Sequence, residues 1–235
     1  MSKINLFEDA LPTSLFRRLA RAVQSVGIER MQDMGSYSTT FWFPLGAKPT
    51  NIVEDCLPKL FALVRPGPTC IGMEWWLGRL KRGESLPFHS DRDRSLRKQT
   101  GQIVHPLWSS ILYLNHFADT PTVIYDQVLS PDGNSWIPPQ PEAGRELDAI
   151  PNHYVTFVGN LRHGVVAKQP AQSSSAPVTQ ASDSPDLRLT LLVNYWDRRP
   201  MPPNCRDYDG SIYPAIYNEA AHRANGSRRR SHAAA

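Results

Sequence analysis

The chain has 235 residues, of which 40% are hydrophobic and 9% aromatic, enough to form a core and to exclude a wholly disordered protein. Its length suits one large domain or two small ones, because domains commonly have roughly 100–200 residues. The net charge of +4 equals the charge of the four arginines in residues 220–235, a segment that contains no acid. The rest of the chain is therefore neutral, and the overall charge does not predict nucleic-acid binding.

The cysteines predict neither a disulfide framework nor a thiolate zinc site. Cys56, Cys70 and Cys205 are scattered and form no Cys-x-x-Cys pair. The N-terminal residues lack the apolar segment of a signal peptide, and no run approaches the ~18–20 apolar residues of a membrane span. We therefore expect a reducing, cytoplasmic setting without membrane attachment. The sequence carries no signal for an oligomeric state.

Two amphipathic segments predict helices within residues 1–69. The first begins at Thr13 or Ser14, either of which can cap it, and ends at Gly27. Its apolar residues recur at helical spacing: Leu15, Phe16, Leu19, Ala22 and Val23. The second covers residues 52–64, and Pro58 inside it predicts a kink or a restart.

From about residue 70 the pattern changes to short runs rich in aromatic and β-branched residues, separated by turn sequences. The expected strands are 74–79, 109–114, 122–125, 154–158, 164–167 and 187–196. We therefore expect a mainly β protein with N-terminal helices, a sandwich or barrel braced by those helices.

The organisation predicted along the chain is a single domain over residues 1–219, with a helical segment at residues 1–69 and a β core at residues 70–200. Residues 169–186 are rich in Ser, Pro, Ala and Gln, and they interrupt the β region as a mobile surface loop. Residues 220–235 form a disordered basic tail.

His89 and Asp91 are the first candidate metal ligands. Residues i and i+2 of an extended chain point to the same side, so these side chains can converge on one point. The spacing alone also fits an exposed turn of charged residues. A second histidine, His163, follows the apolar run 154–158 and favours a metal site over an exposed turn. Two imidazoles and one carboxylate form the facial triad that binds Fe(II) and leaves coordination positions open.

Arg188 and Thr190 are candidate ligands for a carboxylate. Arg188 begins an otherwise apolar strand, and Thr190 lies on the same face two residues later. A guanidinium can bind a carboxylate through two hydrogen bonds, and a hydroxyl can add a third. The alternative for Arg188 is a structural ion pair at the strand edge.

The order His89-x-Asp91, then His163, then Arg188-x-Thr190 resembles the Fe(II)/2-oxoglutarate-dependent dioxygenases, and the N-terminal helices resemble their prolyl-hydroxylase-like branch. The resemblance runs from about residue 74 to residue 196. It implies a double-stranded β-helix core of the jelly-roll or cupin-like kind.

For the site, the resemblance implies that His89, Asp91 and His163 hold Fe(II). Arg188 and Thr190 would bind the distal carboxylate of 2-oxoglutarate, with help from Tyr113. The implied reaction uses O2 to hydroxylate an unactivated C–H bond of an amino acid, peptide or small metabolite, releasing succinate and CO2. Desaturation and cyclisation start in the same way, whereas the carboxylate of Asp91 disfavours halogenation.

Two alternatives stay open. A nucleic-acid demethylase of the same fold would normally carry a second arginine in its co-substrate motif, and residues 191–196 contain none. The second alternative is a metal-free β-barrel that binds a ligand. The partner expected is a small molecule, amino acid or peptide and not nucleic acid.

Substrate specificity is expected to lie in residues 36–44, 126–150 and 169–186, with Trp136 at the entrance. The basic stretch 79–98 is read as a solvated loop, and Asp93 as a residue behind the metal ligands or in contact with substrate. The other histidines are assigned surface or capping roles, or lie in the tail: His105, His116, His153, His222 and His232.

Overall fold

Side chains alternate in direction along β11 (Leu187–Trp196), the middle strand of a seven-stranded sheet. One set packs into a hydrophobic cluster with two helices: Leu189, Leu191, Val193 and Tyr195. The residues between them line a cavity that faces a second sheet: Arg188, Thr190, Leu192 and Asn194. The period of two residues expected of a strand thus separates a structural face from a polar face. The computed structural model describes residues 2–26, 39–168, 187–213 and 216; the predicted loop 169–186 and tail 220–235 lie outside them.

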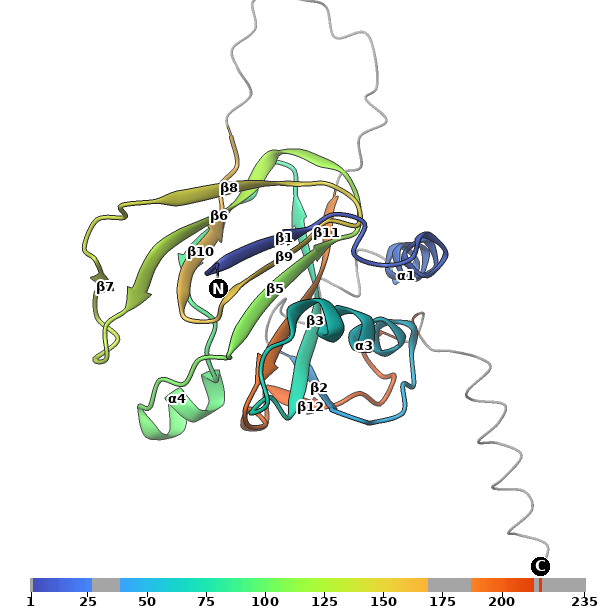
Figure 1. Cartoon of the computed structure of the whole chain (residues 1–235), viewed down its shortest axis with the longest axis horizontal. Coiled ribbons are helices and arrows are strands. Elements are labelled where there is room, and N and C mark those ends of the chain that lie inside the picture. The colour runs from blue at the N-terminus through green and yellow to red at the C-terminus, as the bar shows by residue number, and fades with distance from the viewer. Residues whose placement is uncertain (1, 27–38, 169–186, 214–215, 217–235) are drawn as a thin grey trace, which may run out of the picture.

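Two sheets form the body of the molecule (Figure 1). The larger sheet runs in the order β1 (Ile4–Phe7), β9 (Tyr154–Val158), β5 (Trp108–Tyr113), β11, β3 (Gly72–Lys81), β2 (Thr40–Pro44) and β12 (Cys205–Asp207). The smaller sheet runs β4 (Leu86–His89), β10 (Leu161–Val165), β6 (Phe117–Leu129) and β7 (Trp136–Ile137), with β8 (Gly144–Ala149) also paired to β6. Strand pairs are antiparallel except β12 with β2. The mainly β class is confirmed, and the two sheets are consistent with a jelly-roll-like core.

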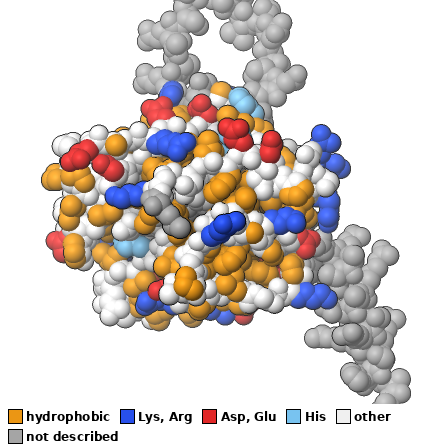
Figure 2. Space-filling model, in the orientation of Figure 1, with side chains coloured by type: hydrophobic (Ala, Val, Ile, Leu, Met, Phe, Trp, Pro, Cys, Tyr) orange, Lys and Arg blue, Asp and Glu red, His pale blue; other side chains and the backbone are white. Residues whose placement is uncertain are grey.

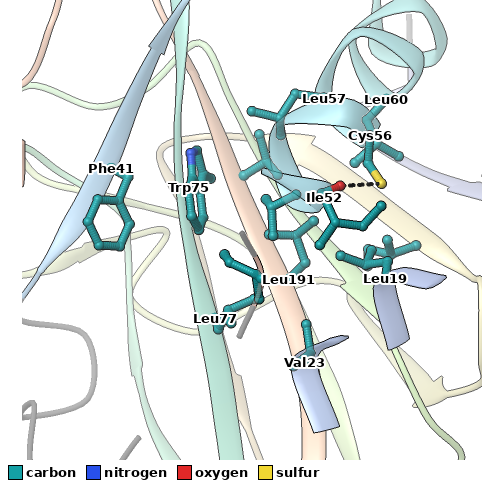
Figure 3. Close-up of a cluster of buried hydrophobic side chains, with 14 of the residues drawn as sticks. Leu19, Val23, Phe41, Ile52, Cys56, Leu57, Leu60, Trp75, Leu77 and Leu191 are labelled. Carbon is teal, nitrogen blue, oxygen red and sulfur yellow. Dashed lines mark hydrogen bonds between the residues drawn. The ribbon is translucent and has the colours of Figure 1, made fainter. Parts of the chain in front are cut away.

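Helices α1 (Thr13–Ser25) and α3 (Ile52–Val64) cover the outer face of the larger sheet. Figure 3 shows their side chains beside Leu77 and Leu191 of the sheet. Asn51 caps α3 by accepting a hydrogen bond from the backbone N–H of Glu54, and the helix continues through Pro58. The N-cap of α1 is Pro12, so neither Thr13 nor Ser14 caps it. A third helix, α4 (Arg94–Thr100), follows the first metal-ligand candidates.

The N-terminal segment contributes strands as well as helices. β1 pairs with β9, and β2 pairs with β3 and β12, so both belong to the larger sheet. The expected division between a helical segment (residues 1–69) and a β core (residues 70–200) is therefore not a boundary of the sheet. Neither β1 nor β2 was predicted, because β1 has only four residues and β2 is mostly a continuous apolar run, so neither shows a clear alternation.

The surface carries charges of both signs, and the three cysteines are unpaired, as the composition predicts. Lys and Arg side chains are interspersed with Asp and Glu on the face shown in Figure 2. Cys56, Cys70 and Cys205 are buried and free. None of the helices in the described ranges is long and apolar enough to cross a membrane.

Candidate active site

His89 and His163 lie directly opposite each other on neighbouring antiparallel strands. β4 ends at His89, and the pairing of β4 with β10 places His163 across from it, with the imidazole centroids 4.4 Å apart. The close approach of the strands depends on Gly164, because a Cβ there would lie 2.8 Å from the carbonyl oxygen of Leu86. Two residues 74 positions apart in the sequence thus share one spot on the sheet.

Backbone carbonyls fix the orientation of both imidazoles. Nδ1 of His89 lies 2.8 Å from the carbonyl oxygen of Pro87, and Nδ1 of His163 lies 2.9 Å from that of Leu161. A carbonyl oxygen only accepts, so each Nδ1 carries the proton and donates. Each Nε2 then keeps a free lone pair, which is the arrangement that a metal-binding histidine needs.

Asp91 completes the group two residues after His89. Its Oδ1 lies 3.8 Å from Nε2 of His89 and 3.8 Å from Nε2 of His163. Burial raises the pKa of Asp91, but the charges of His163 and His89 and the side chains of Ser109 and Asn194 bring it below its ordinary value.

The protonation states suit metal binding. Burial lowers the pKa of His163 to about 4, against the opposing effect of Asp91. At neutral pH the histidine is therefore a neutral donor and the aspartate an anion. One donor atom from each of the three residues lies within 4.8 Å of the others. Two imidazoles and one carboxylate are the donor set of non-haem Fe(II), so the residues present fit this metal.

Arg188 belongs to a buried polar cluster with Thr122 and Tyr113. Its Nη2 donates to Oγ1 of Thr122 at 2.6 Å, and the hydroxyl of Tyr113 donates to the same oxygen at 2.9 Å. The guanidinium carbon lies 5.2 Å from the centre of the Tyr113 ring. Thr190 is the register partner of Tyr113 on β5, so the predicted residues are brought together. Thr122, a residue not predicted for the site, joins them.

One cavity of about 280 Å³ connects the histidine–aspartate group to Arg188. Both sheets line it, and its apolar wall includes Ile111, Val165 and Leu192. Arg188 is only 4% exposed. A buried cation beside hydroxyl groups at the end of a largely apolar cavity is suited to a ligand carboxylate, so these residues also fit a dicarboxylate such as 2-oxoglutarate.

Asp93 and Trp136 each have a structural role, and of the two only Asp93 also lines the cavity. Asp93 caps α4, and its two carboxylate oxygens accept from the backbone N–H groups of Leu96 and Met201. Trp136 does not line the cavity; it stacks with the guanidinium of Arg162, whose carbon lies 5.1 Å from its ring centre.

His105 and Asn194 were missed as parts of the site. The surface or capping role predicted for His105 is incomplete, because its half-buried ring donates from Nδ1 to the backbone carbonyl of Asp91 and so supports that residue. Asn194 continues the alternation of Arg188 and Thr190 along β11, and this period was the available signal. Nothing local marks His105, since the contact joins two loops.

No family model and no curated protein matches this sequence. Among solved structures, AviO1 from Streptomyces viridochromogenes Tue57 is similar with a TM-score of 0.50 and 17% identity, over 85% of this chain and 92% of that one. A Pseudomonas putida prolyl-4-hydroxylase gives a TM-score of 0.48 and 16% identity, over 83% and 89%. A 2OG-Fe(II) oxygenase family oxidoreductase from Burkholderia pseudomallei gives 0.47 and 10%, over 88% and 89%.

At these identities the similarities concern the fold. The similarity to AviO1 therefore shows a shared fold.

Proposed function

We propose that the protein is an Fe(II)- and 2-oxoglutarate-dependent oxygenase that hydroxylates an unactivated C–H bond of an amino acid, peptide or small metabolite. Its core would be a double-stranded β-helix within a single domain over residues 1–219. The observation that carries the proposal is one cavity lined both by the His89–Asp91–His163 group and by a buried arginine, Arg188. A metal site alone or an arginine alone has many other uses.

His89, Asp91 and His163 would hold Fe(II) on one face through two Nε2 atoms and one carboxylate oxygen. The imidazole Nδ1–H groups of His89 and His163 donate to backbone carbonyls, so both rings are held in place before the metal binds. When bound, Fe(II) with 2-oxoglutarate supplies the activation of dioxygen.

Arg188 and Thr190 would bind the distal carboxylate of 2-oxoglutarate, and Tyr113 would assist. Thr122 accepts from both Arg188 and Tyr113, so it holds the guanidinium at one position on the cavity wall. Low exposure strengthens the attraction between a cation and a carboxylate, because little water screens it. The apolar wall around the metal ligands would exclude water and hold the substrate C–H bond in place.

The first experiment tests the metal and the co-substrate together. Purified protein is mixed anaerobically with Fe(II) and then 2-oxoglutarate, and we expect a weak metal-to-ligand charge-transfer band in the visible spectrum. The variant His89→Ala should not give this band. Spectra without the band in both proteins would contradict the proposal and favour a metal-free binding module.

The second experiment tests the reaction. Candidate amino acids and peptides are incubated with the loaded protein in air, with succinate formation as the first readout and mass spectrometry of the product as the second. Hydroxylation predicts a gain of one oxygen atom. Desaturation predicts a loss of two hydrogens from the substrate.

A further inference from the structure

The cavity has a second polar end, away from Arg188, at Glu74. Glu74 lies on β3 in register with Asn194 of β11, and both residues line the cavity. Arg188 and Asn194 are six residues apart on one face of the same strand, a Cα separation of roughly 20 Å at about 3.3 Å per residue. A five-carbon dicarboxylate anchored at Arg188 does not span that distance. The Glu74 end, defined as Glu74 with Asn194 and Thr40, is therefore left for another molecule.

Glu74 is a buried carboxylate that serves no role in the proposed oxygenase site. It is 8% exposed; Oε1 accepts from the hydroxyl of Thr40 at 2.6 Å and Oε2 accepts from Nε1 of Trp196 at 2.9 Å. These two donors, together with the side-chain amide of Asn194, orient the carboxylate without supplying a positive charge. Burial raises the pKa of Glu74 to about 7, and a cation at this end would favour the ionised form.

Asn194 provides an independent sign of a ligand. The residue is 3% exposed, and its Oδ1 has no hydrogen-bond partner among the described residues. Buried polar atoms are almost always paired, so an unpaired acceptor on a cavity wall indicates a donor supplied by a ligand. The amide nitrogen of Asn194 favours the ionised forms of Asp91 and Glu74, which places the oxygen as the free atom.

Oδ1 of Asn194 is an open acceptor at this end, and the buried charge there is negative. Nε1 of Trp76, two residues along β3, is a buried donor without a partner among the described residues on the same cavity. Asp93 also lines the cavity, but backbone N–H groups occupy both of its oxygens. Arg92 and Arg94 also line the cavity but are more exposed than Glu74, so solvent screens them more strongly. A ligand with several N–H donors and a positive charge matches this chemistry.

We propose that Glu74 and Asn194 bind a protonated primary amine of the substrate, which makes the substrate class a small aliphatic amine or an amine-bearing side chain. The inference rests on the proposed oxygenase function, because it takes the Arg188 end as the place of 2-oxoglutarate. The carboxylate and the amide oxygen would accept from the ammonium group. The carbon chain behind that group would then lie toward the metal ligands, between Trp76 and Leu192, which are register partners.

The test compares three probes of equal chain length and different charge: pentylamine, 1-pentanol and pentanoate. Each is titrated by calorimetry into the full chain loaded anaerobically with Fe(II) and 2-oxoglutarate. We expect the amine to bind at least about 10-fold more tightly than either other probe, since the loss of a charged partner at a buried site costs about 1.4 kcal/mol or more. Glu74→Gln keeps the shape of the side chain and should bring the three affinities within about 2-fold of one another.

Arg162→Met is the matched control, because Arg162 stacks on Phe88, Tyr125 and Trp136 outside the cavity. It should leave the preference for the amine unchanged. Equal binding of amine and alcohol to the wild-type protein overturns the inference, and this comparison decides the matter even when Glu74→Gln does not fold. A preference that survives in a folded Glu74→Gln variant overturns it as well.

The charge-transfer band of the same samples separates this inference from the proposed function. A normal band without amine preference overturns the amine site and leaves the oxygenase proposal standing. Amine preference without a band, measured on protein with Fe(II) and 2-oxoglutarate added, supports the amine site and contradicts the oxygenase proposal.

Discussion

Replacement of Arg188 by methionine tests the co-substrate end of the cavity. Arg188 is 4% exposed, donates to Thr122 at 2.6 Å and lies over the ring of Tyr113. Methionine keeps an unbranched stem of similar reach and removes the charge and the donors. Thr122 keeps a partner, because it still accepts from the hydroxyl of Tyr113. The change is therefore confined to the group that would face a carboxylate.

The expected loss follows from the burial of the pair. Truncating one partner of a buried, hydrogen-bonded charge pair costs about 2–5 kcal/mol, which corresponds to a rise in the Kd of 2-oxoglutarate of roughly 30- to 5,000-fold. Arg188→Lys keeps the charge and loses the planar pair of donors, so its Kd should lie between these limits and wild type. Thr190→Val removes one neutral hydrogen bond, worth about 0.5–1.5 kcal/mol, and should raise the Kd roughly 2- to 12-fold.

The assay is an anaerobic titration of the Fe(II)-loaded proteins with 2-oxoglutarate, followed by the charge-transfer band and by calorimetry. Fe(II) affinity and the thermal midpoint are measured on the same preparations to show that each variant is folded. Arg162→Met again serves as the control, because it removes an arginine from the position next to His163 but outside the cavity.

One result would refute the reasoning. A folded Arg188→Met protein that binds 2-oxoglutarate within about twofold of wild type would show that the carboxylate does not lie at Arg188. An equal loss of 2-oxoglutarate affinity in Arg162→Met would show that the effect comes from the fold as a whole and is not specific to the Arg188 end of the cavity.

Three further predictions concern the fold around the site. Gly164→Ala places a Cβ 2.8 Å from the carbonyl of Leu86, so it should lower the free energy of unfolding by about 1–3 kcal/mol and weaken Fe(II) binding; unchanged thermal and metal titrations would contradict this. Glu74 holds a proton in the folded chain up to a pKa of about 7 but loses it near 4.5 when unfolded. As the pH rises from about 4.5 to about 7, the free energy of unfolding of the metal-free wild type relative to Glu74→Gln should therefore fall by roughly 3 kcal/mol, because the folded state binds more protons in this window. The same difference in urea-denaturation free energy between the two proteins at every pH would rule this out. Burial raises the pKa of Cys56 to about 12, and all three cysteines are buried; a thiol reagent should label none in the native protein and three after unfolding, and rapid native labelling would contradict the packing.

Local periodicity made some of the candidate site predictable. The i, i+2 spacing places His89 with Asp91, and Arg188 with Thr190, on one side of an extended chain, because successive side chains of a strand alternate. β11 begins and ends at the predicted residues 187 and 196 for the same reason. Strand β8 (Gly144–Ala149) was not predicted, because most of its residues are polar and its two apolar side chains are too few to show an alternation.

The sequence by itself determined the types and order of the donor groups, the mainly β class, the neutral body and the absence of paired cysteines. Only the tertiary structure decided which groups meet. The pairing of β4 with β10 sets His163 against His89, the pairing of β11 with β5 sets Thr190 against Tyr113, and the fold adds Thr122 and brings Glu74 beside Asn194. These contacts depend on strand register between distant segments, and register is set by packing across the whole core, which no local window of sequence contains.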